Sequence, residues 1–504
     1  MKNGNPTLEA LLAECKPAVV GSWQSTGTLN KEVLGLAQDS RAVAPGFVFF
    51  AIKGTAVDGH DYIAKAIESG AVAVVCERLP EQVQEDITYI RASDSSMLMG
   101  YMASAFYGHP SQELQLVGIT GTNGKTTTVT LLYRLFRQLG YKAGLLSTIE
   151  NRIDTQVVAS THTTGDALEL NALLRRMVDE GCEYAFMEVS SHAVVQNRIA
   201  GLQFKGGIFS NITRDHLDYH KTFDAYIKAK KLFFDRLPAT AFALVNTDDR
   251  NGEVMLQNTE ALCRTYSLRS PADFNVKVLE NTLEGLLLEI DGTEVNMRLV
   301  GRFNAYNLAA IYACAILLGM EKNEVLCAMS RLTEAPGRFE TLKSTTGNKL
   351  GIVDYAHTPD ALQNVLSTIN SMRDHLREVI CVLGCGGNRD SGKRPVMAQI
   401  AADLSDRLII TTDNPRFEEP QAIIDQMLTG LSPTQRAKTL CITDRREAIR
   451  TACALAGDGD VVLVAGKGHE NYQEIKGVKH HFDDREVLAE CLPAVWNNAP
   501  KSDE

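Results

Sequence analysis

The sequence predicts an α/β fold of three domains, and two features of the chain predict it. Apolar runs of strand length alternate with amphipathic segments of helix length over residues 95–189 and again over 350–466. Such alternation is typical of a parallel sheet covered by helices. The segment LVGITGTNGKTTT at 116–128 joins a strand to a helix through three glycines. We therefore expect a central domain with a parallel sheet and a phosphate-binding P-loop, a C-terminal doubly wound, Rossmann-like domain, and a small α/β domain at the N-terminus.

The expected elements follow in chain order. The N-terminal domain, residues 1–92, contains a strand over 47–54 and a helix, turn and strand over 63–77. The central domain, residues 93–340, has helices at 95–108, 126–140 and 167–181 and strands at 114–120, 143–147 and 184–189. The C-terminal domain, residues 341–504, has strands at 350–355, 379–384, 407–412 and 460–466 and helices at 361–376, 394–405 and 446–457.

Composition and charge exclude several classes of function. The 504 residues are 44% hydrophobic and 22% charged, which is the balance of a globular protein with two to four domains. The net charge of −11 argues against broad electrostatic binding to nucleic acid or an anionic membrane. The start of the chain lacks a signal-peptide pattern, and the longest apolar run, near 309–320, is too short for a membrane span. Eleven scattered cysteines without a CxxC pair fit reduced thiols, so we expect a cytoplasmic protein.

The glycine-rich loop predicts a site for a nucleoside triphosphate. The strict P-loop pattern fails because Ile119 occupies the first glycine position, but Gly118, Gly121 and Gly124 give a shifted form, GITGTNGKT. Glycines let successive N–H groups point inward, and the following helix presents its positive end to phosphate. Lys125 can reach the β- and γ-phosphates, and the Thr126 hydroxyl can bind magnesium. The structural alternative is a strand-to-helix turn that binds no ligand.

A lysine lies within an apolar helical stripe. Over residues 222–234, apolar side chains recur at helical spacing, and Lys230 lies seven residues after Phe223 in the middle of them. A buried lysine must pair with a carboxylate, extend its amine to water or lose its proton. A neutral amine can take up CO₂ as a carbamate and become an anionic metal ligand. From the residues alone, extension of the amine to water is the preferred interpretation.

Two further residue types fit a magnesium site. His216 and His220 are spaced i, i+4, but the glutamate of a zinc-peptidase H-E-x-x-H helix is missing. A single histidine near magnesium is the functional alternative, and a structural histidine is the other. Glu188 comes near the end of the expected strand 184–189, where a carboxylate suits a magnesium ligand beside a P-loop. A cap or a surface charge is the structural alternative for Glu188.

Together with further motifs, these residues resemble the Mur ligases of bacterial cell-wall synthesis over nearly the whole chain. The first 307 residues carry DSR at 39–41, GTNGKTT at 121–127, THTTGDA at 161–167, MEVSSHAVVQNR at 187–198, NITRDHLDYH at 211–220 and GRFNAYN at 301–307. The rest of the chain carries APGRFE at 335–340, VDYAHTPDAL at 353–362, GCGGNRDSGKRP at 384–395, TTDNPR at 411–416 and AGKGHE at 465–470. So many spaced blocks in the same order leave little room for coincidence.

The resemblance implies a ligase that phosphorylates a carboxylate with ATP and lets an amine attack the acyl phosphate. It also implies Mg²⁺ and a carbamylated lysine, by position Lys230, which reverses the preference stated above. The catalytic residues implied are Lys125, Lys230, Glu188 and His216, and the metal ligands are Thr126, Glu188, His216 and Lys230. The nucleotide-binding residues implied are Gly121, Thr122, Asn123, Gly124, Lys125, Thr126, Thr127, Asn304, Arg338, Asp354 and His357.

The resemblance further implies that the acyl substrate is UDP-N-acetylmuramoyl-L-alanyl-D-glutamate. Its implied binding residues are Gln38, Ser40, Thr55, Ala56 and Val57 at the uridine end, and His162, Thr163, Thr164, Ser190, Gln196 and Arg198 nearer the glutamate. The amine donor is expected at Arg389, Asp413, Asn414, Pro415, Arg416, Gly466 and Glu470. The arginines can pair with carboxylates, and the acidic residues can accept from an ammonium group. This set favours meso-2,6-diaminopimelate over L-lysine, because lysine would leave a carboxylate-binding arginine without its partner.

Two residues depart from the family pattern, and other functions stay open. His162 stands where the family often has asparagine, and Asn388 replaces a frequent aspartate, so we expect changed contacts at both positions. The alternatives are the same reaction with L-lysine, a folylpolyglutamate synthase-like ligase, a dinucleotide-binding module built on GCGGNRD, and a non-catalytic nucleotide-binding scaffold. DNPR and the N-terminal DSR disfavour the second, and GCGG lacks the full G-x-G-x-x-G spacing. We expect a monomer.

Overall fold

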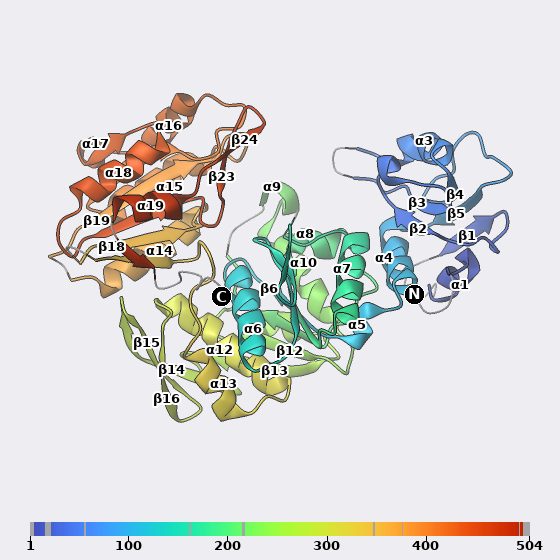
Figure 1. The fold of residues 1–504 in the computed structure, drawn as a ribbon, viewed down its shortest axis with the longest axis horizontal. Helices are drawn as coiled ribbons and strands as arrows, with labels where there is room; N and C mark the ends of the chain where they lie inside the picture. The colour runs from blue at the N-terminus through green and yellow to red at the C-terminus, as the bar shows by residue number, and fades with distance from the viewer. Residues whose placement is uncertain are drawn as a thin grey trace, which may run out of the picture. The chain divides into compact units, whose positions relative to one another are not determined.

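The structure is a computed structural model that describes residues 5–15, 22–54, 57–160, 163–213, 217–345, 348–374, 376–492 and 494–496. The chain forms two compact units, residues 1–265 and 266–504, drawn in order from blue to red in Figure 1. Both units combine helices with largely parallel sheets, as the α/β prediction requires. This division into two units does not test the predicted domain boundaries at residues 92 and 340, which stay predictions.

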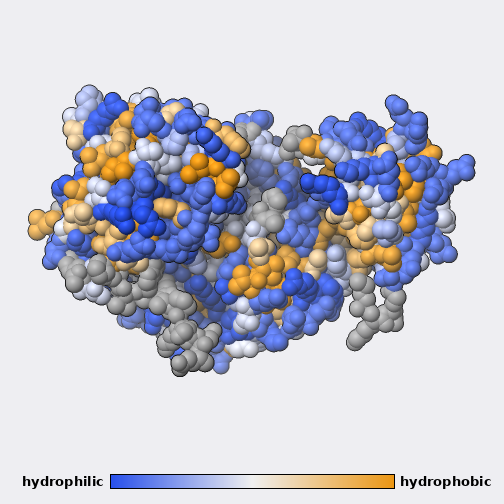
Figure 2. Space-filling model, turned by 45° about the horizontal axis from the view of Figure 1, so that its top comes forward, coloured by the Kyte–Doolittle hydropathy of each residue, from blue (hydrophilic) through white to orange (hydrophobic). Residues whose placement is uncertain are grey.

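Hydrophilic residues cover most of the face shown in Figure 2, and hydrophobic residues occur there in small groups. Among the described residues, no helix combines the length and the apolar character needed to cross a bilayer. The mixed surface agrees with the composition of a globular protein.

The first unit begins with a five-stranded sheet. Its strand order is β1 (Trp23–Thr26), β5 (Thr88–Ala92), β4 (Ala71–Cys76), β3 (Phe47–Phe50) and β2 (Gly35–Ala37), with only β1 antiparallel to its neighbour. The accompanying helices are α1 (Leu8–Ala13), α3 (Ile63–Glu68) and α4 (Ser95–Phe106). The strand predicted over 47–54 and the helix and strand predicted over 63–77 are confirmed as β3, α3 and β4. Leu98 and Met102 of α4 share one buried cluster with Val48 and Val75 of this sheet.

The larger sheet of the first unit has a parallel centre. Its strand order is β7 (Ala143–Leu146), β10 (Tyr184–Glu188), β6 (Gln115–Thr120), β11 (Gly206–Phe209) and β12 (Phe242–Asn246). The antiparallel strands β8 (Asn151–Ile153) and β9 (Gln156–Val158) extend it beyond β7, and β13 (Leu262–Ser267) follows β12. Its helices are α5 (Pro110–Glu113), α6 (Lys125–Gln138), α7 (Ala167–Asp179), α8 (Ser191–Val195), α9 (Leu217–His220), α10 (Phe223–Asp235) and α11 (Gly252–Leu256).

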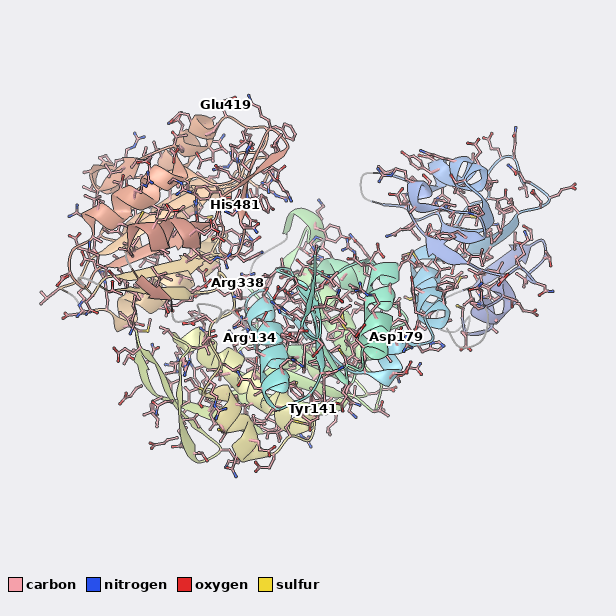
Figure 3. The ribbon with its side chains drawn as sticks, in the orientation of Figure 1. Arg134, Tyr141, Asp179, Arg338, Glu419 and His481 are labelled. Carbon is pink, nitrogen blue, oxygen red and sulfur yellow. The ribbon has the colours of Figure 1, made fainter. Side chains whose placement is uncertain are left out.

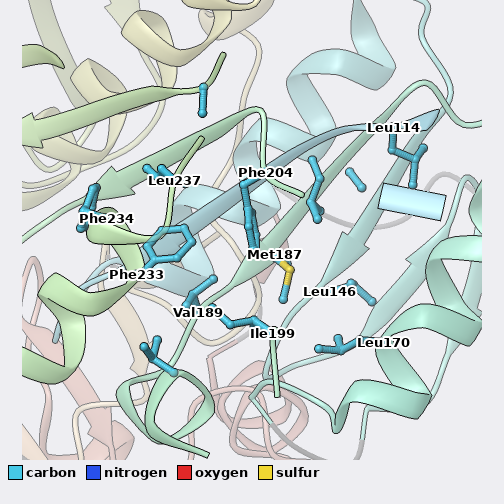
Figure 4. Close-up of a cluster of buried hydrophobic side chains, with 14 of the residues drawn as sticks. Leu114, Leu146, Leu170, Met187, Val189, Ile199, Phe204, Phe233, Phe234 and Leu237 are labelled. Atoms are coloured by element: carbon cyan, nitrogen blue, oxygen red, sulfur yellow. The ribbon is translucent and has the colours of Figure 1, made fainter. Parts of the chain in front are cut away.

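Helix α10 packs its apolar stripe into the core beside β6 and β10 (Figure 4). The rings of Phe233 and Phe204 meet edge to face with their centroids 5.0 Å apart. A Cβ on Gly118 of β6 would lie 2.7 Å from Cζ of Phe233 and 2.8 Å from Cγ2 of Val189. This first glycine of the predicted loop is therefore needed for close packing between strand and helix, because any larger residue would displace α10.

The second unit begins with an antiparallel meander and two helices. The strands are β14 (Phe274–Thr282), β15 (Gly285–Ile290) and β16 (Thr293–Met297), and the helices are α12 (Arg302–Leu317) and α13 (Lys322–Met329). Helix α12 is apolar on all sides and is buried over most of its length, as expected for a helix surrounded by protein. The aromatic rings of Phe274 on β14 and Tyr312 on α12 pack edge to face.

The second unit then forms a seven-stranded sheet. Its strand order is β21 (Thr439–Cys441), β20 (Arg407–Thr412), β19 (Val379–Cys385), β22 (Val461–Ala465), β18 (Leu350–Asp354), β17 (Glu340–Ser344) and β25 (Ala494–Trp496). The five strands from β21 to β18 are parallel. The helices are α14 (Pro359–Met372), α15 (Lys393–Leu404), α16 (Pro420–Leu428), α17 (Pro433–Ala437), α18 (Arg445–Leu455) and α19 (Asp484–Cys491), and β23 (Tyr472–Ile475) pairs with β24 (Val478–His481) as a separate hairpin.

Two buried clusters lie on the opposite faces of this sheet. One contains residues of α14, α15 and α16, and the other contains residues of α18 and α19. Helices on both faces of a parallel sheet confirm the doubly wound prediction. In such folds, ligands bind beyond the carboxyl ends of the strands, which here are Asp354, Cys385, Thr412 and Ala465.

Candidate active site

The glycine-rich loop connects the carboxyl end of β6 to the start of α6. Gly124 is the residue before the helix, has φ +88° and offers no side-chain cap to the first helical turn. The N–H groups of that turn and the positive end of the helix dipole are therefore suited to binding an anion. The helix begins at Lys125, and Thr126 and Thr127 are buried in its first turn. The predicted strand, loop and helix are all present.

Hydrogen bonds to the segment that follows β11 fix the conformation of the loop. The Asn211 side chain accepts from the Asn123 N–H at 2.9 Å, and the Ser210 hydroxyl donates to the Asn123 carbonyl at 2.7 Å. The Thr122 hydroxyl lies 3.2 Å from the Tyr226 hydroxyl of α10. The sequence analysis did not assign these supporting residues. Asn211 could have been found, because it follows a strand that pairs in parallel with β6.

Two lysine amines meet at one backbone carbonyl. Nζ of Lys125 and Nζ of Lys230 each lie 2.8 Å from the Gly121 oxygen, and Lys125 also donates to Thr122 at 2.9 Å. Lys230 is 1% exposed, and its Nζ lies 4.6 Å from the centroid of the Tyr226 ring. The interpretation drawn from the residues alone, that this amine extends to water, is therefore wrong. The helix directs the lysine into the core, and the amine reaches the P-loop.

Glu188 lies at the edge of the sheet that carries the P-loop. It ends β10, stands opposite Ile119 of β6 and is 1% exposed. Its Oε1 accepts from the Thr148 N–H at 2.8 Å. Among the described residues, no three His, Cys, Asp or Glu side chains are grouped as a metal site. Of the predicted metal ligands, His216 lies outside the described residues.

The donors of this region suit magnesium. A buried carboxylate at Glu188 and a buried hydroxyl at Thr126 are hard oxygen ligands, which Mg²⁺ prefers in proteins. Magnesium also keeps several waters and commonly binds through one or two protein oxygens together with phosphate. The residues present therefore fit the expected ion.

The predicted acyl-substrate residues of the first unit form one hydrogen-bonded group. The Thr164 hydroxyl donates to the Glu188 carbonyl at 2.8 Å and lies 3.3 Å from the Ser190 hydroxyl. Arg198 donates to the Thr164 carbonyl at 2.8 Å and to the Gln196 side chain at 3.0 Å. The structure thus brings these four predicted residues together beside the P-loop sheet. Thr163 is adjacent in the chain, and His162 lies outside the described residues.

The predicted uridine-end residues are only partly described. Ser40 is 6% exposed in a short turn whose preceding residue, Asp39, pairs with Arg41. Gln38 donates to the side chain of Asp166, at the start of α7, at 2.6 Å. Thr55 and Ala56 lie outside the described residues, and the other member of this set, Val57, is exposed.

In the second unit, several predicted nucleotide-binding residues gather beyond β18. Arg338, labelled in Figure 3, lies over the Tyr355 ring with Cζ 4.5 Å from its centroid. The His357 ring lies 4.5 Å from the same ring. Burial raises the pKa of Asp354 to about 6, although the Arg338 charge and backbone N–H groups, including that of Phe339 at 2.7 Å, oppose the rise. The fourth predicted residue, Asn304, is buried in α12 and donates to the Val300 carbonyl.

The residues predicted to bind the amine donor lie in the loops that follow β20 and β22, except Arg389, which follows β19. Asn414 donates to Oε2 of Glu470 at 2.7 Å. A Cβ on Gly466, which has φ +116°, would lie 2.8 Å from Oδ2 of Asp413, so this glycine leaves room beside the carboxylate. Arg416 pairs with Glu474 at 3.3 Å. These residues therefore combine acidic and basic groups, as recognition of a zwitterionic amino acid requires.

The loop after β19 lies directly against the loop after β20. The Gly387 N–H donates to the Asn414 carbonyl at 2.9 Å, and Arg416 donates to the Gly387 carbonyl at 2.8 Å. A Cβ on Gly387 would lie 1.9 Å from the Pro415 carbonyl, which explains the glycine. Asn388 has φ +52°, and its side chain accepts from the Phe417 N–H at 3.0 Å. Its neighbour Arg389 is exposed in the same loop.

Three buried charged residues near this site were missed by the sequence analysis. Lys467 is 0% exposed and donates to Asn414, Glu470 and Tyr472. Arg394 is 1% exposed and donates to Glu418 and to the Gly386 carbonyl. The third, Arg445, is 0% exposed and pairs with Asp484 in the core. Only Lys467 could have been noticed in the sequence: it lies between two glycines in AGKGHE, and glycines allow close approach of a buried side chain.

Comparisons with known proteins agree with these features. Models of the Mur ligase family match residues 32–107 (Mur ligase family, catalytic domain), 119–315 (Mur ligase middle domain) and 337–468 (Mur ligase, glutamate ligase domain). A protein of Phocaeicola vulgatus named UDP-N-acetylmuramoyl-L-alanyl-D-glutamate--2,6-diaminopimelate ligase is 60% identical over 466 residues, or 92% of this chain and 96% of that protein. A protein of the same name from Bacteroides fragilis is 56% identical, over 96% and 99% of the two chains.

Solved structures give the same result. A structure of a UDP-N-acetylmuramoyl-L-alanyl-D-glutamate--2,6-diaminopimelate ligase is 32% identical with a TM-score of 0.68 and covers 97% of this chain and 99% of that chain. MurF from Acinetobacter baumannii, 17% identical with a TM-score of 0.63 and a coverage of 97% and 98%, shares the fold. With relatives above half identity along nearly its whole length, the chain belongs to the Mur ligase family.

Proposed function

We propose that this chain is an ATP-dependent ligase that joins meso-2,6-diaminopimelate to UDP-N-acetylmuramoyl-L-alanyl-D-glutamate in peptidoglycan precursor synthesis. The identity of 56–60% to curated ligases of that name supports this assignment. The observation in the structure that carries it is the meeting of Lys125 and Lys230 at the Gly121 carbonyl, on the sheet edge that also carries Glu188. This edge provides cations for a triphosphate and a carboxylate for its metal.

The reaction begins with transfer of the γ-phosphoryl group of ATP to the carboxylate of the D-glutamate residue. The P-loop N–H groups and Lys125 bind the phosphate oxygens and stabilise the charge that spreads over them during transfer. Thr126, Glu188, His216 and Lys230 would hold Mg²⁺, which when bound neutralises phosphate charge. Thr164, Ser190 and Arg198 orient the acyl substrate. The diaminopimelate amine then attacks the acyl phosphate, forms the amide bond and expels inorganic phosphate.

Lys230 is proposed to carry a carbamate. A neutral amine adds to CO₂, forms an N–C bond and releases a proton, so that a cationic side chain becomes an anionic one. The burial of Lys230 supports this step, because a buried ammonium is costly and a second cation, Lys125, approaches the same carbonyl oxygen. An anionic carbamate on Lys230 would attract the Lys125 cation, whereas an ammonium group on Lys230 would repel it.

The amine donor is proposed to bind at the ends of β20 and β22. Arg416 and Arg389 recognise the distal carboxylate of diaminopimelate, and Asp413 and Glu470 accept from its distal ammonium group. L-Lysine has the ammonium group and lacks the carboxylate, so it would leave a guanidinium without its partner. Asn304, Arg338, Asp354 and His357 are proposed to contact the nucleotide.

The compartment and the assembly state are also proposals. All eleven cysteines are free thiols, and both ATP and reduced thiols belong to the cytoplasm. We infer a cytoplasmic enzyme, and we propose that it acts as a monomer. Sedimentation at working concentration tests the monomeric state, and a dimer would contradict it.

The purified enzyme tests the proposed activity directly. With ATP, Mg²⁺ and the UDP-muramoyl dipeptide, phosphate release should depend on meso-diaminopimelate and should be far slower with L-lysine. Mass spectrometry should detect the tripeptide product. Faster release with L-lysine would contradict the donor assignment, and turnover with a folate substrate in place of the dipeptide would favour the folylpolyglutamate synthase-like alternative.

A further inference from the structure

Lys467 is a fully buried lysine beside the proposed amine-donor site. It comes two residues after β22 ends at Ala465, and its side chain is 0% exposed. Its Nζ lies 3.2 Å from Oδ1 of Asn414 and 3.2 Å from Oε2 of Glu470, and it also donates to the Tyr472 carbonyl. With three acceptors for its three donor positions, this ammonium group is fixed in one place.

The Lys467 contacts determine how Asn414 and Glu470 are oriented. Oδ1 of Asn414 accepts from Lys467 and from the Glu474 N–H at 2.9 Å, so the amide nitrogen must face the other way. That nitrogen donates to Oε2 of Glu470 at 2.7 Å. Lys467 therefore holds Oε2 of Glu470 both directly and through Asn414.

The second oxygen of Glu470 is open. No donor among the described residues contacts Oε1, and the side chain is 17% exposed. Asp413 lies close enough for its charge to act on Glu470, and its Oδ2 faces the space that Gly466 leaves. A ligand ammonium group that enters here would meet the carboxylates of Asp413 and Glu470.

The charge of Lys467 opposes the repulsion between these carboxylates. Burial and then the Asp413 charge raise the pKa of Glu470, whereas Lys467 and Asn414 lower it. The charge of Glu470 also acts on Tyr355, Tyr472 and Arg445. Without Lys467, two neighbouring carboxylates would share a partly buried site, and one would retain its proton more readily.

We propose that Lys467 is a positioning residue for the amine donor: it fixes Glu470 as an oriented carboxylate whose open Oε1 accepts the distal ammonium group of the incoming diamino acid. The inference rests on the proposed function, because it takes the ligand at Asp413 and Glu470 to be the amine donor. It adds a role that neither the P-loop nor the arginines of the donor site provide. Lys467 acts through Glu470 and does not itself contact the donor.

The test compares Lys467→Met with Lys479→Met in the full-length enzyme. Lys479 is a matched control because it also faces the Tyr472 ring, at 4.2 Å against 5.5 Å for Lys467, but is exposed. In Lys467→Met, the KM for meso-diaminopimelate should rise about 10- to 100-fold, which is the effect of losing a hydrogen bond to a charged group. The KM values for ATP and for the UDP-muramoyl dipeptide should stay within about twofold, and Lys479→Met should resemble the wild type.

A double-mutant cycle and a pH profile separate positioning from a structural role. In the Glu470→Gln background, Lys467→Met should add little to the KM for diaminopimelate, because its effect passes through Glu470. In Lys467→Met, the rise of kcat/KM for diaminopimelate with pH should move to higher pH, because Glu470 loses a neighbouring cation that lowers its pKa. An equal rise in all three KM values, additive effects in the cycle or an unmoved pH profile would overturn the proposal.

The remaining outcomes are also decisive. If Lys467→Met does not fold, Lys467→Gln should fold and show the same selective loss, because the amide restores hydrogen bonds without the charge. If neither variant folds while Lys479→Met does, Lys467 serves stability and the proposal is wrong. Wild-type enzyme without diaminopimelate-dependent turnover would contradict the proposed function itself, which distinguishes the two failures.

Discussion

Replacing Arg445 by methionine is expected to loosen the donor-binding end of the C-terminal sheet. Arg445 begins α18 and forms two hydrogen bonds of 2.7 Å with Asp484, the first residue of α19. The same guanidinium donates to the carbonyls of Ala465 at 3.1 Å and Thr412 at 3.4 Å. These carbonyls end β22 and β20, directly before the loops that carry the proposed donor-binding residues. One buried arginine therefore joins two helices to two strand ends.

The expected loss of stability follows from the burial of the ion pair. Arg445 and Asp484 are both 0% exposed, so removal of the arginine leaves a carboxylate in the core without compensation, at a cost of about 3–5 kcal/mol. The adjacent Arg446 provides the control: it pairs with Glu490 at 2.6 Å, but their side chains are 38% and 52% exposed. A solvent-exposed pair contributes about 0–1 kcal/mol. Two neighbouring arginines on one helix are therefore expected to differ by several kcal/mol.

Amide hydrogen exchange measured by mass spectrometry resolves this difference. Peptides from β20 and β22 should exchange roughly 10²- to 10³-fold faster in Arg445→Met, since about 1.4 kcal/mol corresponds to a factor of ten. The same peptides should change less than about tenfold in Arg446→Met. Arg445→Met combined with Asp484→Leu should recover most of the protection, because neither charge stays buried alone. Equal exchange in the two single variants would refute the reasoning.

Three further substitutions or treatments test other parts of the site. Gly121→Ala places a Cβ 1.9 Å from Oγ of Ser210 and should abolish ATP binding measured by calorimetry. Gly140→Ala, which is strained at φ +92° but meets no atom within 4 Å, lies outside the loop and should retain ATP binding; equal affinities would contradict the loop geometry. The raised pKa of Asp354, about 6 against 3.8, means that its contribution to stability falls as pH rises from about 4 to about 6. In urea titrations across that window, the free energy of unfolding of Asp354→Asn should therefore rise by up to about 3 kcal/mol relative to the wild type. The variant should lose activity. A rise in stability that does not depend on pH would contradict this reasoning. Native mass spectrometry with labelled bicarbonate should find one added CO₂ that is absent from Lys230→Ala; no added mass in active enzyme would contradict carbamylation.

The pattern of strands, helices and loops could be predicted because it is local. Alternation of apolar runs identified the parallel strands, and the glycine and threonine pattern at 118–128 identified the start of α6 at Lys125 within one residue. Glu188 could be assigned to the same sheet edge as the P-loop because the carboxyl ends of neighbouring parallel strands meet. The roles of Thr164 and Arg198, by contrast, came only from resemblance, since nothing in their spacing indicates that they meet.

The buried polar contacts could not be predicted because they depend on tertiary structure. Helical spacing placed Lys230 on the apolar face of α10 but did not give the partner of its amine, since Gly121 lies 109 residues away in the chain. Arg445 and Asp484, 39 residues apart, look like ordinary helix-surface charges in the sequence. Only the packing of α18 against α19 removes them from water. Sequence patterns identify which face is buried, and contacts between distant segments determine which charges can be buried with it.

The measurement that tests the central claim most directly is oxygen tracing through the acyl phosphate. The UDP-muramoyl dipeptide is labelled with heavy oxygen in the carboxylate of its D-glutamate residue and incubated with ATP, Mg²⁺ and meso-diaminopimelate. The proposed mechanism predicts that one labelled oxygen appears in the inorganic phosphate for each amide formed, because the carboxylate oxygen stays with the transferred phosphoryl group. Amide formation with unlabelled phosphate would contradict carboxylate phosphorylation and, with it, the proposed role of the P-loop and its two lysines.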